Sequence, residues 1–130
     1  MGDRSEIRTP NAPDPVGPYS QAVRSGPFIF ASGQIPLDPA SGRIVDGEIE
    51  DQTRRVLENL SAVLVAGGAS LGDVVRTTVY VTDLSLFPRI NAVYAEFFAG
   101  EPAPARATVQ VAALPLGAHV EIDAIAVAPA

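Results

Sequence analysis

Apolar residues between positions 50 and 66 recur at the 3.6-residue spacing of an α-helix. They form one stripe, made of Val56, Leu57, Leu60, Val63 and Leu64. We expect the helix to end at Gly67-Gly68, because glycine adopts the left-handed conformation of a helix C-terminus at little cost. A second stripe predicts a helix over residues 86–98, with Pro88 in its first turn; it consists of Phe87, Ile90, Tyr94 and Phe97.

Five shorter segments have the β-branched or alternating composition of strands. They are residues 19–23, 28–32 and 74–81, and two more within residues 104–126, joined by the turn 114–117. Ser25-Gly26-Pro27 separates the first two segments and predicts an antiparallel hairpin. The order is β-β-α-β-α-β-β, an α+β chain. Since each helix has one apolar stripe to bury, we expect one mixed sheet with two helices on one face.

The last two predicted strands place ionisable side chains among apolar neighbours. Alternation puts Arg106, Thr108 and Gln110 on one face of the first strand, and Glu121 and Asp123 on one face of the second. Charge in such surroundings is costly unless something pairs with it. Arg106 and Glu121 therefore indicate either a small-molecule site or an ion pair at a sheet edge.

Three single positions have an ordinary and a functional interpretation. Gly33 either ends a strand or permits close approach of a ligand to the backbone. Asn91 borders the second helical stripe, where its amide either reaches a ligand or caps a neighbouring loop. His119 stands alone at a loop-to-strand junction, which favours a structural or exposed residue over a catalytic one.

The length of 130 residues fits a single domain over residues 1–130, in which residues 1–15 form an irregular polar lead-in. Hydrophobic residues make up 47% of the chain and charged residues only 18%. This composition is lean in charge for a small monomer and indicates contacts between subunits.

The charge balance excludes several classes of partner and cofactor. The net charge is −6, all nine basic residues are Arg, and there is no Lys. A scattered set of Arg among more numerous acids disfavours nucleic-acid binding. Without Lys there is no Schiff base for pyridoxal phosphate and no phosphate-binding loop lysine, and no glycine-rich dinucleotide motif follows a strand. We expect no cofactor.

Metal sites and membrane segments are not predicted either. The chain has no Cys and a single His, so no cysteine or multi-histidine metal site can form. No segment reaches eighteen apolar residues and the polar start lacks a signal core. We expect no membrane association and a cytoplasmic location.

The whole chain resembles the RidA family, also called YjgF or the reactive intermediate deaminase family. The resemblance depends on several blocks in order and at matching spacing. They are Asn11-Ala12-Pro13, Gly17-Pro18-Tyr19-Ser20-Gln21-Ala22, Ala31-Ser32-Gly33-Gln34-Ile35-Pro36, Gln52-Thr53, Leu57-Glu58-Asn59-Leu60, Val79-Tyr80-Val81-Thr82-Asp83-Leu84, Ile90-Asn91 with Tyr94 and Phe97-Phe98, Pro104-Ala105-Arg106, and residues 120–126.

This resemblance implies a chorismate-mutase-like fold and a homotrimer with clefts between adjacent subunits. It also implies hydrolysis of 2-imino acids, or of their enamine tautomers such as 2-aminoacrylate, to 2-oxo acids and ammonia. The alternative within the same fold is a trimer that binds a small metabolite without turnover. Endoribonuclease or translation-inhibitor activity is disfavoured by the acidic balance, the absence of Lys and the lone His119.

The family's site residues carry over to matching positions of this sequence. Arg106 matches the residue that holds the substrate carboxylate, and Glu121 matches the acid that activates the attacking water. The matching pocket residues are Tyr19, Ser32, Gly33, Asn91, Ala107 and Thr108. Many members have Cys at the position of Thr108, so the resemblance implies that this chain lacks thiol-based regulation but keeps the reaction. Partial burial of Glu121 beside Ile125 and Val127 is expected to raise its pKa.

Overall fold

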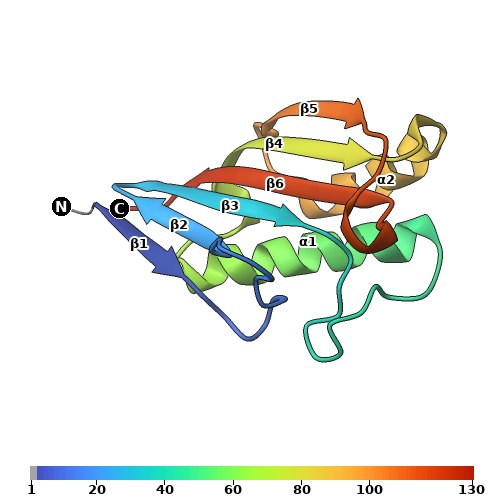
Figure 1. Cartoon of the computed structure of the whole chain (residues 1–130). Coiled ribbons are helices and arrows are strands. Elements are labelled where there is room, and N and C mark those ends of the chain that lie inside the picture. Colours follow the sequence, from blue (N-terminus) through green and yellow to red (C-terminus); the bar gives the residue numbers. More distant parts are fainter. Residues whose placement is uncertain (1–2) are drawn as a thin grey trace.

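The computed structural model describes residues 3–130 as one mixed sheet with two helices (Figure 1). The α-helices are α1 (Ile49–Ala66) and α2 (Phe87–Phe97), and short 3₁₀ turns occur at Leu71–Asp73, Leu84–Leu86 and Pro115–Gly117. The strands are β1 (Arg4–Ile7), β2 (Ala22–Ser25), β3 (Phe28–Gln34), β4 (Val74–Val81), β5 (Ala105–Gln110) and β6 (Val120–Val127).

The six strands are arranged in the order β1-β2-β3-β6-β4-β5. All neighbours are antiparallel except β4 and β5, which are parallel. Strand β6 therefore lies in the middle of the sheet between β3 and β4, while β5 forms one edge (Figure 1). Although β5 and β6 follow each other in the sequence, they are not paired.

Most elements agree with the sequence-based expectation, including the two helices and the β2–β3 hairpin. The irregular lead-in is wrong for Arg4–Ile7, which form β1 and pair with β2 from Arg4↔Ser25 to Ile7↔Ala22. Only Ile7 of this strand is buried. The other three residues are polar and exposed, so the strand lacks the apolar pattern by which strands are predicted. The first hairpin strand also begins at Ala22, not at Tyr19.

The core lies between the helices and one face of the sheet. Leu57, Leu60 and Leu64 of the α1 stripe are fully buried, as are Val79 of β4 and Ile122 of β6. Strand β6 alternates strictly between buried and partly exposed positions. Its Val120, Ile122, Ala124 and Ala126 face the helices, so its acidic residues face the other way.

The opposite face of the sheet, here called the uncovered face, has no helix across it. It includes Phe28 and Phe30 of β3, Tyr80 of β4, and Glu121, Asp123 and Ile125 of β6, as the strand register shows. Phe28 and Phe30 are both exposed, with ring centroids 6.3 Å apart. Across residues 3–130, no helix has the length and apolar character needed to cross a membrane.

Candidate functional site

A cavity of about 450 Å³ opens where the start of β6 meets the end of β3. Tyr19, Gly33 and Glu121, three of the residues predicted from the sequence, line it. Its other walls come from three loops. The loop residues are Pro13, Asp14 and Val16 before β2, Ile35 and Leu37 after β3, and Pro115 and Leu116 before β6. We call this space the Glu121 cavity.

Within the cavity, the side chain of Glu121 packs directly against the backbone of Gly33. A β-carbon added to Gly33 would overlap a carboxylate oxygen of Glu121. Gly33 lies where the pairing of β3 with β6 shifts register, between Ala31 and Gln34. The group that approaches Gly33 closely is therefore the Glu121 side chain, and the approach of a ligand to this backbone stays a prediction.

The pKa of the Glu121 carboxyl is raised above its ordinary value. Burial is the main cause, and the negative charge of Asp123, two residues along the same face of β6, adds to it. Asp123 is held by two donors, since it accepts hydrogen bonds from the Thr78 N–H (3.2 Å) and the Tyr80 hydroxyl (3.2 Å). A carboxyl group with a raised pKa can exchange protons closer to neutral pH.

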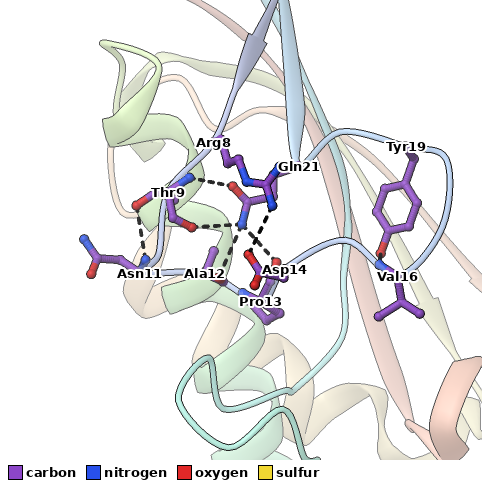
Figure 2. A network of polar contacts seen from close by, with 9 residues as sticks. All are labelled: Arg8, Thr9, Asn11, Ala12, Pro13, Asp14, Val16, Tyr19 and Gln21. Carbon is purple, nitrogen blue, oxygen red and sulfur yellow. Dashed lines mark hydrogen bonds and ion pairs between the residues drawn. The ribbon is translucent and has the colours of Figure 1, made fainter.

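The loop before β2 is fixed by a buried amide (Figure 2). Gln21 is only 1% exposed, and its Oε1 accepts a hydrogen bond from the Thr9 N–H at 2.7 Å. Its amide N–H groups donate to the carbonyls of Thr9 (3.0 Å) and Pro13 (2.9 Å), with a longer contact to that of Ala12 (3.3 Å). Gln21 therefore determines where this wall of the cavity lies.

Tyr19 stands at the far end of the same loop. Its hydroxyl accepts a hydrogen bond from the Val16 N–H at 3.4 Å, and Figure 2 shows the ring and Val16 side by side. The side chain of Tyr19 is largely exposed. The loop thus presents an aromatic ring and an aliphatic side chain at the cavity.

Arg106 belongs to a second cluster, on β5 and α2. Its Nη1 donates to Asn91 Oδ1 at 2.8 Å, and its guanidinium lies 5.1 Å from the ring centroid of Phe87 and 4.8 Å from that of Tyr94. Asn91 therefore positions Arg106, which neither interpretation of this amide from the sequence included. Within residues 3–130 Arg106 makes no ion pair, so its remaining N–H groups are available to an anion.

The two clusters lie on opposite faces of the sheet. Arg106 is level with Thr77 of β4, which points into the core and hydrogen-bonds Tyr94 of α2 at 2.7 Å. Glu121 is level with Tyr80, three residues further along β4, which belongs to the uncovered face. Arg106 and Glu121 of one chain are therefore not an ion pair, and one copy does not combine them in one cavity.

The remaining predicted residues divide between the clusters. Thr108 faces the same side as Arg106, while Ala107 faces the uncovered side, because side chains alternate along β5. Ser32 precedes Gly33, but its hydroxyl donates to the Ser20 carbonyl at 2.7 Å. Its side chain therefore supports the chain leading into β2.

Several residues that shape the clusters were not singled out from the sequence. For Pro115 and Leu116 the sequence predicted only a turn. No local pattern shows that this turn lines the same cavity as Gly33. Phe87 and Tyr94 were interpreted as core positions of the helix, yet both also pack on Arg106. The role of Gln21 could have been predicted from the sequence, because a buried amide between a strand and a Pro-rich loop needs hydrogen-bond partners.

No three His, Asp or Glu side chains in the described part of the chain gather closely enough to hold a metal ion. His119 is exposed, and its Nδ1 lies 3.0 Å from the Thr82 hydroxyl, consistent with the structural interpretation of this residue.

Comparisons with known proteins agree on one family. The family described as endoribonuclease L-PSP matches residues 9–128. A RutC family protein of Pyrococcus horikoshii is 56% identical over 92% of this chain and 94% of its own length. The 2-iminobutanoate/2-iminopropanoate deaminase of Mus musculus is 47% identical over 95% of this chain and 91% of its own. A crystal structure of E. coli TdcF with bound serine is 46% identical, with a TM-score of 0.90 over 96% of this chain and 99% of the other.

Fold and site together define a small α+β protein with a carboxyl group of raised pKa in a cavity on one side of its sheet and an arginine without an ion pair, within residues 3–130, on the other. The chain belongs to the RidA family, as the resemblance of its sequence blocks implied.

Proposed function

We propose that this chain hydrolyses reactive 2-imino acids and their enamine tautomers, such as 2-aminoacrylate and 2-iminobutanoate, to 2-oxo acids and ammonia. The observation that carries this proposal is the Glu121 carboxyl, which has a raised pKa and stands at the wall of a cavity large enough for a small acid. The imine carbon is already electrophilic, so a positioned water and one group that moves protons suffice.

In this reaction Glu121 takes a proton from the water that attacks C2. The C–O bond forms, and the π electrons of the C=N bond pass to nitrogen, giving a tetrahedral carbinolamine. The protonated Glu121 first returns its proton to the nitrogen, which becomes an amino group. The Glu121 carboxylate then takes the proton of the new hydroxyl, whose electron pair forms the C=O bond as the C–N bond breaks. This proton passes to the departing nitrogen, so that ammonia and a 2-oxo acid are released. A carboxyl with a raised pKa suits both directions of this transfer.

Arg106 holds the substrate carboxylate in this proposal. Its planar guanidinium can form two parallel hydrogen bonds to a carboxylate, and Asn91, Phe87 and Tyr94 restrict its orientation. Among the described residues that line the Glu121 cavity none is basic, and Asp14 and Glu121 are acidic. The cation for the substrate must therefore come from outside the cavity.

We therefore propose that the complete site forms between two copies of the chain, within a homotrimer. Arg106 of one copy would face Glu121 of the next, because a single copy holds them on opposite faces. The exposed apolar side chains of the uncovered face, Phe28, Phe30 and Val109, provide the surface for such an assembly. Tyr19, Ser32, Gly33 and Glu121 would belong to one side of each cleft, and Asn91, Arg106 and Thr108 to the other.

The names of relatives support this proposal. The mouse protein is named as a deaminase of 2-imino acids, and the TdcF structure is described with serine, a small amino acid. The family description instead mentions an endoribonuclease. We favour the deaminase, because two acidic residues in the cavity and a net charge of −6 would repel the phosphates of RNA.

A coupled assay tests the proposal. An amino acid oxidase generates imines from alanine or leucine, and semicarbazide traps whatever imine is not hydrolysed. The wild-type protein should lower semicarbazone formation and raise 2-oxo acid, while Arg106→Ala should remove this effect. Arg43→Ala, in an exposed loop, is the matched control and should behave as wild type. If neither wild type nor Arg106→Ala lowers semicarbazone formation, a trimer that binds a metabolite without turnover is favoured; if both lower it equally, Arg106 does not hold the substrate.

A further inference from the structure

Two exposed aliphatic side chains line the Glu121 cavity from separate loops. Val16 is 86% exposed and Leu116 is 68% exposed. Single exposed apolar residues are common, but these two share the rim of one concavity. In Figure 2, Val16 points away from the loop that Gln21 holds in place.

Leu116 also has an unusual backbone. Its φ of 57° and ψ of 24° are left-handed, and in residues 3–130 it is the only residue other than glycine with a positive φ. Gly117 follows with a φ of 72°, and the turn is closed by the Ala118 N–H donating to the Pro115 carbonyl at 3.1 Å.

A leucine is a poor choice for this position if the turn alone matters. Glycine or asparagine accepts the left-handed conformation with less strain, and an exposed leucine contributes little to the core. Strained backbone of this kind is often retained where the side chain has a task at a binding site. Because Leu116 lines the Glu121 cavity, contact with a molecule bound there would supply such a task.

The size of the cavity suggests what that is. At about 30 Å³ for each water-sized group, a six-heavy-atom acid such as 2-aminoacrylate fills roughly 180 Å³. The cavity measures about 450 Å³. The space beyond Glu121 is bounded by apolar residues, among them Ile35, Leu37 and Pro115, so it suits an aliphatic group.

We propose that Leu116 and Val16 form a specificity rim that contacts the substrate side chain, and that the preferred substrates are 2-imino acids with branched aliphatic side chains, such as the imine of leucine. This inference rests on the proposed deaminase function and adds the substrate class. Leu116 and Val16 select the side chain, whereas Arg106 and Glu121 act on groups that all 2-imino acids share.

The test compares kcat/KM for the leucine-derived and alanine-derived imines in the coupled assay. Wild type should prefer the leucine-derived imine by about tenfold or more. Leu116→Asn keeps a residue that tolerates the left-handed backbone but removes the apolar contact. It should lower kcat/KM for the leucine-derived imine by about tenfold and change that for the alanine-derived imine by less than about threefold.

Leu116→Gly should give the same pattern, which guards against an effect of the asparagine side chain or of poor folding. Val65→Gln, an exposed position on α1 outside the cavity, is the control and should change neither rate. If alanine-derived imine is hydrolysed and the leucine-derived rate survives both Leu116 changes, the specificity rim is wrong and the deaminase function stands. If wild type hydrolyses neither imine, both proposals are wrong.

Discussion

The carboxylate of Glu121 occupies the space that a β-carbon on Gly33 would need. This packing makes residue 33 a sensitive position even though Gly33 has no positive φ, so alanine is compatible with its backbone. We expect Gly33→Ala to fold and to displace the Glu121 carboxylate. A displacement on the order of 1 Å should lower kcat for imine hydrolysis about 100-fold.

The matched control is Gly100→Ala, because a β-carbon there meets nothing within 4 Å. Both variants should show the circular dichroism spectrum of wild type, and only Gly33→Ala should lose activity in the semicarbazide assay. Wild-type kcat in Gly33→Ala would mean that the position of Glu121 does not matter for the reaction.

Asn91 gives a second prediction, because it accepts a hydrogen bond from Arg106 at 2.8 Å. Asn91→Ala should leave the guanidinium less well oriented and raise KM about tenfold, with a smaller effect on kcat. Asn91→Asp should raise KM further, since a carboxylate at this position would pair with Arg106 and compete with the substrate. The measurement is steady-state kinetics with the leucine-derived imine. A lower KM in Asn91→Asp would exclude Arg106 as the carboxylate-binding group.

Asp123 gives a prediction about pH. The pKa of Glu121 is raised first by burial and then by the charge of Asp123. If ionised Glu121 activates water, kcat/KM rises as pH increases through that pKa. Asp123→Asn removes a negative charge and should lower the pKa of Glu121, so the acidic limb moves to lower pH. The pKa that this acidic limb reports should stay above the ordinary value of a carboxyl group, because the Glu121 carboxyl remains partly buried.

The pH profile of Asp46→Asn is the control, since this exposed position carries the same change of charge. Its acidic limb should coincide with that of wild type. An unchanged limb in Asp123→Asn, or a shift to higher pH, would contradict the assignment of this limb to Glu121.

Arg106 and Glu121 show which features of the fold and the candidate site can be predicted from the sequence. Alternation along each strand correctly predicted which side chains share a face of that strand, and the periodic stripes located both helices. Whether Arg106 and Glu121 lie on the same face of the sheet depends on which strands pair. Strand β5 pairs in parallel with β4, whereas β6 inserts between β3 and β4, and no local pattern encodes that choice.

The cavity was harder to predict for the same reason. Gly33, Leu116 and Val16 are far apart in the sequence and meet only because the loops at one end of the sheet converge. Their residue types carried a weak signal. The interpretation of residues 114–117 as a turn was correct, whereas β3 continues past Gly33 to Gln34. Neither interpretation described the space between these two segments.

A mixing experiment tests the shared cleft. Arg106→Ala and Glu121→Gln should each be inactive alone. Unfolded together and refolded at equal amounts, they should form mixed trimers in which some clefts have both an intact Arg106 and an intact Glu121. For random assembly of closed trimers, about a quarter of the wild-type site activity should return. No recovery, despite mixed trimers seen by mass spectrometry, would place both residues in the site of a single copy.

The placement of Arg106 and Glu121 on opposite faces of the sheet also has a consequence for when the proposed site would form. In the proposed assembly, a copy that has folded completely still lacks a working cleft until a neighbour supplies the other half. Catalysis would therefore depend on how much of the protein a cell contains, and specific activity would decline on dilution while the secondary structure stayed intact.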